Sequence, residues 1–116
     1  LNGLLAALQG YGYAVEVVSW LAKGETSKQF DSATRKNKRA WLRKYYPAID
    51  LRNVHVVKHG TNKWRVSNYK GGILFDDESG NVNAWQRDTS SGKAVRIKDS
   101  TTLLDALESL IVQELE

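Results

Sequence analysis

Apolar residues follow a helical period at both ends of the chain and form short extended runs between them. Leucines at positions 4, 5 and 8 predict a short amphipathic helix over residues 1–11. The clearest helix is predicted near the carboxyl terminus, with Thr102 and Asp105 at capping-box spacing. Its apolar stripe consists of Leu103, Leu104, Leu107, Leu110, Ile111 and Leu115.

The middle of the chain alternates between predicted strands and predicted helices. Runs rich in β-branched, aromatic or other apolar residues predict strands at 13–20, 54–58, 71–75 and 94–97. A helix capped by Asp31 or Ser32 is expected to end before Pro47. A helical turn near 64–70, a short helix after Asn81 and a loop over 88–93 complete the order. This alternation predicts an α/β fold, a Rossmann-like parallel sheet with helices on both faces.

Composition indicates one ordinary domain, covering residues 1–116. The 116 residues are 41% hydrophobic and 26% charged, which permits a buried core, and no apolar run is long enough to span a bilayer. No secretory leader and no cysteine are present, so we expect a cytoplasmic protein without a membrane partner. The net charge of +4 suits an anionic ligand such as a phosphate ester and is too small to demand nucleic acid.

Three acidic residues follow the apolar run at 73–75, where a strand is expected to end. Asp76, Asp77 and Glu78, with Asn81 close by, supply the oxygen ligands that Mg²⁺ prefers. An acidic loop that caps the following helix explains the same residues equally well. Ser19, at the end of the strand at 13–20, either donates to a phosphate oxygen or bonds its own backbone, and the second reading is favoured from the residue alone.

The helix after residue 31 carries a basic run interleaved with aromatic residues. Such a run occurs in nucleic-acid-binding helices, but it is more often a solvated face with its aromatic residues packed inward, which we favour. His55 and His59 do not suggest zinc, because residues four apart in an extended segment lie about 13 Å from each other. The basic residues are Arg35, Lys36, Lys38, Arg39, Arg43 and Lys44.

Taken in order, these segments resemble the haloacid dehalogenase-like phosphatase superfamily, and within it the small 5'-nucleotidases, including the deoxyribonucleotidase type and related phage proteins. Val17-Val18-Ser19 is similar to the second motif of that family, and Lys23 lies where the nucleotidases carry a phosphate-contacting lysine. The segment from Lys38 to Pro47 is similar to their Lys-x-x-Trp-(Val/Leu)-x-Lys-(Tyr/His)-(Phe/Tyr) helix.

The second half of the chain carries the rest of the resemblance. Lys63, in Gly60-Thr61-Asn62-Lys63, resembles the lysine of the third motif, and its context favours it over Lys58. Leu74-Phe75-Asp76-Asp77 with Asn81 resembles the fourth motif. The resemblance implies that Ser19, Lys23 and Lys38 bind phosphate, that Lys63 and Ser19 are catalytic, that Asp76 and Asp77 hold Mg²⁺, and that Asn81 braces the acidic loop.

One motif of the family is absent from this sequence. The family's nucleophile is the first Asp of an Asp-x-Asp-x-(Thr/Val) motif on a central strand, and no such motif occurs here. That strand would lie between the strand ending at Ser19 and the strand ending at Asp76. Because the chain also begins at Leu1 and lacks methionine, we expect a longer protein or a partner segment, including a second copy in a dimer, to complete the sheet.

Three functions remain open on the sequence. The resemblance implies a Mg²⁺-dependent phosphatase acting on a phosphorylated small molecule, a nucleotide, and this chain alone should turn over little substrate. A non-catalytic module of the same fold would bind nucleotide, nucleic acid or protein, with the helix around Lys38 and Trp41 carrying the binding. A structural domain that recruits a partner by strand addition is the third.

Overall fold

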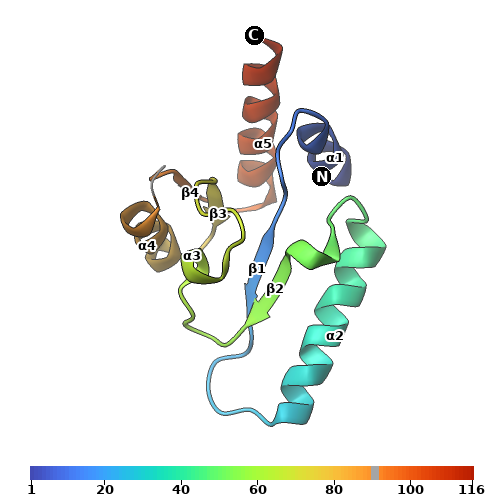
Figure 1. Ribbon diagram of the computed structural model, residues 1–116, viewed down its shortest axis with the longest axis vertical. Helices are drawn as coiled ribbons and strands as arrows, with labels where there is room; N and C mark the ends of the chain where they lie inside the picture. Colours follow the sequence, from blue (N-terminus) through green and yellow to red (C-terminus); the bar gives the residue numbers. More distant parts are fainter. Residues whose placement is uncertain (90–91) are drawn as a thin grey trace.

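The computed structural model describes residues 1–89 and 92–116, which form a mixed α/β structure with helices and strands in alternation (Figure 1). The predicted loop over 88–93 includes Ser90 and Ser91, which lie outside the described residues. The elements, in chain order, are α1 (Asn2–Gly10), β1 (Val17–Trp20), α2 (Lys28–Tyr45), the 3₁₀ turn η1 (Leu51–Asn53), β2 (Val54–Val57), α3 (Lys63–Val66), β3 (Leu74–Asp76), α4 (Ser79–Asp88), β4 (Ala94–Arg96) and α5 (Ser100–Leu115).

Two helices begin earlier than the sequence predicted. Helix α2 starts one turn before Asp31, because Ser27 Oγ accepts a hydrogen bond from the amide of Phe30 at 3.0 Å. Helix α5 starts at Ser100, because Asp99 accepts from the amide of Thr102 at 2.8 Å. The predicted capping box at Thr102 is therefore wrong. In both cases a second cap residue upstream satisfies the first amides of the helix.

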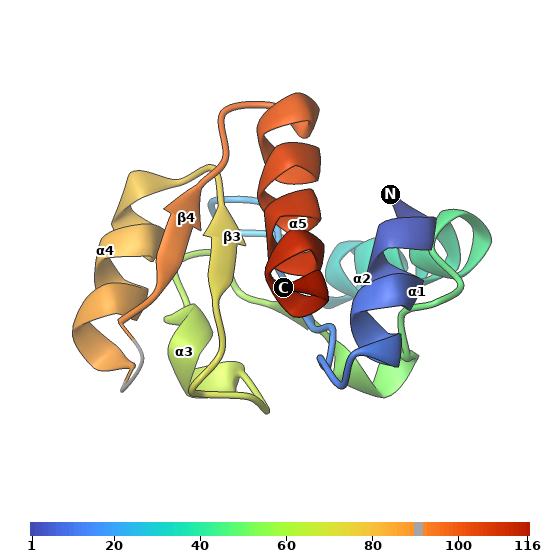
Figure 2. The ribbon, with the colours of Figure 1, turned by 90° about the horizontal axis from the view of Figure 1, so that it is seen from above.

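The strands form two parallel pairs and not the single sheet that the sequence predicted. Strand β1 pairs with β2 from Val17↔Val54 to Trp20↔Val57, and β3 pairs with β4 from Leu74↔Ala94 to Asp76↔Arg96. Within the described residues no ladder joins β1 to β3. The strands of the two sheets run in clearly different directions (Figures 1 and 2). The prediction of parallel pairing is confirmed. The prediction of one continuous sheet is wrong, because the described residues include no strand pairing that joins the two sheets.

The hydrophobic core lies between α1, β2 and α5. It is built around the buried residues Leu5, Leu8, Val54, Val56 and Leu107. Helix α5 lies between the β3–β4 sheet and α1, so it contributes to both halves of the molecule (Figure 2). Helix α5 therefore supplies the apolar packing that joins the two sheets.

The chain is more open than a folded protein of its mass usually is. Its accessible surface is 7612 Å², whereas about 6,300 Å² is typical for 13.0 kDa. Its radius of gyration is 14.6 Å against about 13.4 Å for 116 residues. All four residues of β1 are only partly buried.

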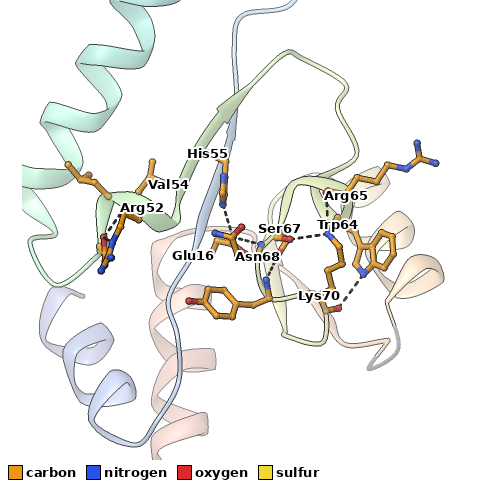
Figure 3. A network of polar contacts seen from close by, with 12 residues as sticks. Glu16, Arg52, Val54, His55, Trp64, Arg65, Ser67, Asn68 and Lys70 are labelled. Carbon is orange, nitrogen blue, oxygen red and sulfur yellow. Dashed lines mark hydrogen bonds and ion pairs between the residues drawn. The ribbon is translucent and has the colours of Figure 1, made fainter.

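A polar network centred on Glu16 joins the β1–β2 sheet to the segment that leads into β3 (Figure 3). The Glu16 carboxylate, whose side chain is 11% exposed, contacts His55 Nε2 at 2.7 Å and accepts from the amide of Asn68 at 2.7 Å. It also accepts from the hydroxyl of Ser67. Glu16 and His55 lie at the amino ends of β1 and β2, away from the carboxyl ends where the predicted site residues lie. We therefore assign the network a structural role. His55 thus makes the ordinary polar contact that the sequence predicted.

We expect Glu16→Gln to lower the free energy of unfolding by about 2 kcal/mol, because charge-assisted hydrogen bonds contribute roughly 1.5–3 kcal/mol and the variant leaves His55 without its carboxylate. Urea denaturation at pH 7 measures the change. Glu108→Gln is the matched control, since Glu108 is exposed on α5 and makes no hydrogen bond within the described residues. An equal loss in both variants would show that the network does not join the two halves.

Candidate functional site

The first part of the candidate site lies at the carboxyl end of β1. Lys38, on α2, donates from Nζ to Ser19 Oγ at 2.7 Å and to the main-chain oxygen of Trp20 at 2.8 Å. Because Ser19 accepts from the ammonium, its own hydroxyl proton is free to point to another acceptor. No carboxylate pairs with Lys38 in the described part of the chain. A part-buried ammonium without a counter-ion, beside a hydroxyl donor, favours an anion.

The second part lies at the carboxyl end of β3. Lys63 Nζ contacts Asp76 Oδ2 at 2.7 Å, and the two side chains are 14% and 5% exposed. Asn81 donates to the same oxygen at 3.2 Å, and the amide of Glu78 donates to Oδ1 at 2.9 Å. Asn62 caps α3 by accepting from the amide of Trp64, which places Lys63 at the first position of that helix. Lys63 and Asp76 are therefore in contact, whereas the prediction that Ser19, Lys63, Asp76 and Asp77 form one functional site stays a prediction.

Trp20 connects the two parts. Its indole Nε1 donates to the main-chain oxygen of Thr61 at 2.9 Å, and Lys63 Nζ lies 5.4 Å from the ring centroid. The ring of His59 packs against it with centroids 4.7 Å apart. The ends of β1 and β3 are therefore joined through the Lys63 side chain, although the strands themselves do not pair.

Two of the predicted site residues make fewer contacts. Asp77 is exposed, and its main-chain oxygen accepts from Arg96 Nε at 3.3 Å. Lys23 lies exposed in the loop between β1 and α2 and makes no hydrogen bond or ion pair with the described residues. The roles predicted for Asp77 and Lys23 stay predictions. Asn81, by contrast, braces Asp76 as expected.

The residues present do not form a complete metal centre. Both carboxylate oxygens of Asp76 already accept hydrogen bonds, and one of them carries the Lys63 ion pair. Within the described ranges, no group of three or more His, Cys, Asp or Glu side chains is placed to hold a metal ion. Mg²⁺ is commonly held by one or two carboxylates with water completing its shell, so Asp76 could join Asp77 as a ligand only if it gave up its ion pair with Lys63.

Helix α2 differs from the predicted solvated basic face with inward-packed aromatic residues. Arg35 Nε donates to the main-chain oxygen of Val56 at 3.1 Å, and Arg39 NH2 donates to that of Val54 at 2.9 Å. Trp41 and Tyr45 are instead 53% and 52% exposed. The predicted inward packing of Trp41 and Tyr45 is therefore wrong, whereas four of the six basic residues are exposed as predicted. Arg35 and Arg39 in addition satisfy carbonyl groups that the outer edge of β2 presents.

An apolar groove lies between α2 and the face of the β1–β2 sheet. Its volume is about 450 Å³, and it reaches Ser19 and Lys38 at the carboxyl end of β1. Because Val17 and Ser19 point to this face, a strand paired with β1 would direct alternate side chains into the same groove. The lining residues, named here the α2 groove, are Val17, Ser19, Asn37, Lys38, Trp41, Leu42, Val54 and Val56.

Sequence reasoning missed the three tryptophans near Lys63. Trp20, Trp64 and Trp85 come from β1, α3 and α4, yet all three line one cavity beside that lysine. Four tryptophans in 116 residues were the available signal, but Trp20, Trp64 and Trp85 were interpreted only as parts of a predicted strand, helical turn and helix.

Asp88 helps to fix the loop that carries this site. The guanidinium of Arg87 and the amide of Asn62 both donate to its carboxylate and lower its pKa to about 2. Asp88 therefore stays ionised at any pH suited to assays, and the link between α4 and the Asn62 cap persists.

Comparison with protein-family models, with curated proteins and with solved structures gave no match to this chain. None of the helices in the described ranges combines the length and the apolar character that crossing a membrane requires.

Proposed function

We propose that this chain is the phosphate-binding core of a haloacid dehalogenase-like phosphatase of the 5'-nucleotidase type. It would hydrolyse phosphomonoesters when a further strand, carrying the nucleophilic aspartate, pairs with β1. The proposal includes the finer description of the fold, a Rossmann-like sheet that lacks its central strand. The observation that carries it is the placement of Ser19–Lys38 and Lys63–Asp76 at the ends of two strands that do not pair with each other.

The side chains of this chain suit the binding of a phosphate dianion. The Ser19 hydroxyl, which accepts from Lys38, donates to a phosphate oxygen, and Lys38 supplies positive charge that no carboxylate of the described chain neutralises. Lys63 is held by its ion pair with Asp76 at the end of β3, with its ammonium 5.4 Å from the centroid of the Trp20 ring. Such fixed donors and ammonium groups stabilise a phosphoryl group by electrostatics and positioning.

The nucleophile and the metal ion belong to the part of the proposal that needs an added strand. A parallel strand paired with the open edge of β1 would place its carboxyl end beside Ser19 and Trp20. An Asp-x-Asp there would supply the nucleophile and the further carboxylate that Asp77 lacks for holding Mg²⁺. The open edge of β1 and the α2 groove both support such a strand.

The alternative, a non-catalytic module that binds nucleic acid through α2, is less well supported. Arg35 and Arg39 are engaged with the edge of β2, and Lys38 with Ser19, so half of the six basic residues point to the sheet. The remaining three are Lys36, Arg43 and Lys44. A weakened basic face reduces the electrostatic attraction that carries most non-specific nucleic-acid binding.

Titration of the 116-residue chain with inorganic phosphate tests the proposal. We expect saturable binding that shifts the amide resonances of Ser19 and Trp20 in NMR spectra. Lys38→Met should weaken binding at least about tenfold, because a charge-assisted hydrogen bond contributes roughly 1.5–3 kcal/mol. Lys36→Met is the matched control, since Lys36 is exposed on the same helix. Equal weakening in both variants, or no phosphate binding at all, would overturn the proposal.

A further inference from the structure

Helices α2 and α5 leave large apolar side chains uncovered. Among the described residues, Phe30, Trp41 and Tyr45 of α2 and Val112 and Leu115 of α5 are each more than half exposed. None of the 18 residues of α2 is buried, although it is longer than any other helix in the described chain. A helix with apolar side chains usually buries them against a neighbour, so the outer sides of these two helices are available to a partner.

The exposed aromatic residues of α2 lie along one side of the helix, with a lysine among them. Phe30 and Trp41 are eleven positions apart, which is about three turns, and Lys44 and Tyr45 lie one turn beyond Trp41. Lys44 Nζ lies 5.2 Å from the centroid of the Tyr45 ring. We name these four residues the α2 face.

The outer side of α5 combines apolar side chains with an acidic one. Asp105 and Val112 are seven positions apart, which is about two turns, and Leu115 lies one turn beyond Val112. All three are exposed, and we name them the α5 face. Helices α2 and α5 have 18 and 16 residues, or lengths of about 27 and 24 Å, so the two faces match in extent.

The charges of the two helices are complementary. Helix α2 carries seven basic residues and one acidic residue, whereas α5 carries three acidic residues and no basic residue. Pairing α2 with another α2, or α5 with another α5, brings like charges together, which disfavours both arrangements. The α2 face therefore fits an acidic amphipathic helix, and α5 of a second copy of this chain has that chemistry.

The positions of the two helices allow both contacts to form at once. Figure 1 shows α5 and α2 toward opposite ends of the longest axis of the molecule, whose extent is 50 Å. When two copies lie side by side with these axes antiparallel, α2 of each copy meets α5 of the other. The two contacts are then related by a two-fold axis, and the assembly closes at two copies.

We infer that the chain forms a two-fold dimer in which the α2 face of each copy binds the α5 face of the other. The inference goes beyond the proposed phosphatase and does not depend on it, because no residue of either face belongs to the phosphate site. It also differs from a dimer that completes the sheet, since neither face includes a residue of β1.

Sedimentation equilibrium of the 116-residue chain tests for the dimer. We expect the mass to rise with protein concentration from 13.0 kDa toward about 26 kDa, twice the mass of one chain. Raising the ionic strength from about 0.1 to about 1 M should weaken the dimer about tenfold, because it shortens the Debye length from about 10 Å to about 3 Å.

Two charge reversals locate the contact. Lys44→Glu on the α2 face and Asp105→Lys on the α5 face should each raise the dissociation constant at least about tenfold, because each substitution places like charges together at both contacts. An equimolar mixture of the two variants should dimerise again, since each contact of the mixed pair joins opposite charges. Lys58→Glu is the matched control, because Lys58 is exposed after β2 and lies on neither face.

The possible results distinguish this dimer from other arrangements. A chain that stays monomeric at every concentration would overturn the inference, and so would a dimer that survives both reversals, which would indicate another surface such as the open edge of β1. If both variants and their mixture stayed monomeric, the two faces would not be partners. Far-UV circular dichroism shows that a variant is folded, so that loss of the dimer is not mistaken for unfolding.

Discussion

Replacing Lys63 by methionine is expected to lower the free energy of unfolding by about 3–5 kcal/mol, because it leaves the Asp76 carboxylate buried without its counter-ion. The side chain of Asp76 is only 5% exposed, and water cannot readily replace the ammonium at 2.7 Å. Asn81 and the amide of Glu78 would still donate to Asp76, but neither carries charge. Urea denaturation at pH 7 measures the loss.

The double variant Lys63→Met, Asp76→Asn separates the cost of the unpaired charge from the loss of packing. It should be more stable than Lys63→Met alone, since no buried charge remains and Asn still offers an oxygen to Glu78. Arg52→Met is the control, because the Arg52–Asp50 pair is exposed and its loss should cause no measurable change. If Lys63→Met behaved like this control, the ion pair would not be part of the folded core.

Local sequence patterns predicted the presence of the helices and strands better than the residues at which they begin and end. The leucine spacing of α1 and the apolar stripe of α5 fixed both helices, because each pattern depends on neighbours within the same segment. The start of α2 was misplaced because Ser27, Asp31 and Ser32 are all competent caps and the sequence does not rank them. Strand β1 is shorter than predicted, since only Val17–Trp20 has a partner.

Relations between distant segments were predictable only where a motif linked them. The family resemblance brought Lys63 and Asp76 together, and their contact is present. Nothing in the sequence indicated that Glu16 would join His55 and Ser67, because these residues are far apart in the chain. The single sheet failed for a related reason: its continuity depends on pairing between β1 and β3, and the apolar runs do not determine which strands pair.

Adding the proposed strand is expected to produce the largest change in activity. We would fuse five β-branched apolar residues, followed by Asp-Gly-Asp-Gly-Thr and a Gly/Ser linker of about 20 residues, before Leu1. Such a linker has an end-to-end distance of about 25 Å, comparable to the shortest dimension of 25 Å. With Mg²⁺ present, hydrolysis of 4-nitrophenyl phosphate should exceed that of the chain alone by at least about 10³-fold.

The same fusion should raise the melting temperature by about 5 °C or more, because the strand pairs with the open edge of β1 and fills the α2 groove. A control in which both aspartates are replaced by asparagine should keep the added stability and lose the turnover. A control with lysine at alternate strand positions should show neither effect, since the α2 groove is mostly apolar.

These controls distinguish the pairing of an added strand with β1 from the hydrolysis of the phosphoester. If the aspartate fusion were stabilised but showed no turnover, the phosphatase proposal would be excluded, whereas the pairing of a strand with β1 would still be supported. If no fusion raised the melting temperature, β1 would not accept a strand, and Ser19 and Lys38 would then have to bind their anion without a nucleophile beside them. The unpaired edge of β1 favours binding of a strand, and the unneutralised charge of Lys38 favours binding of an anion.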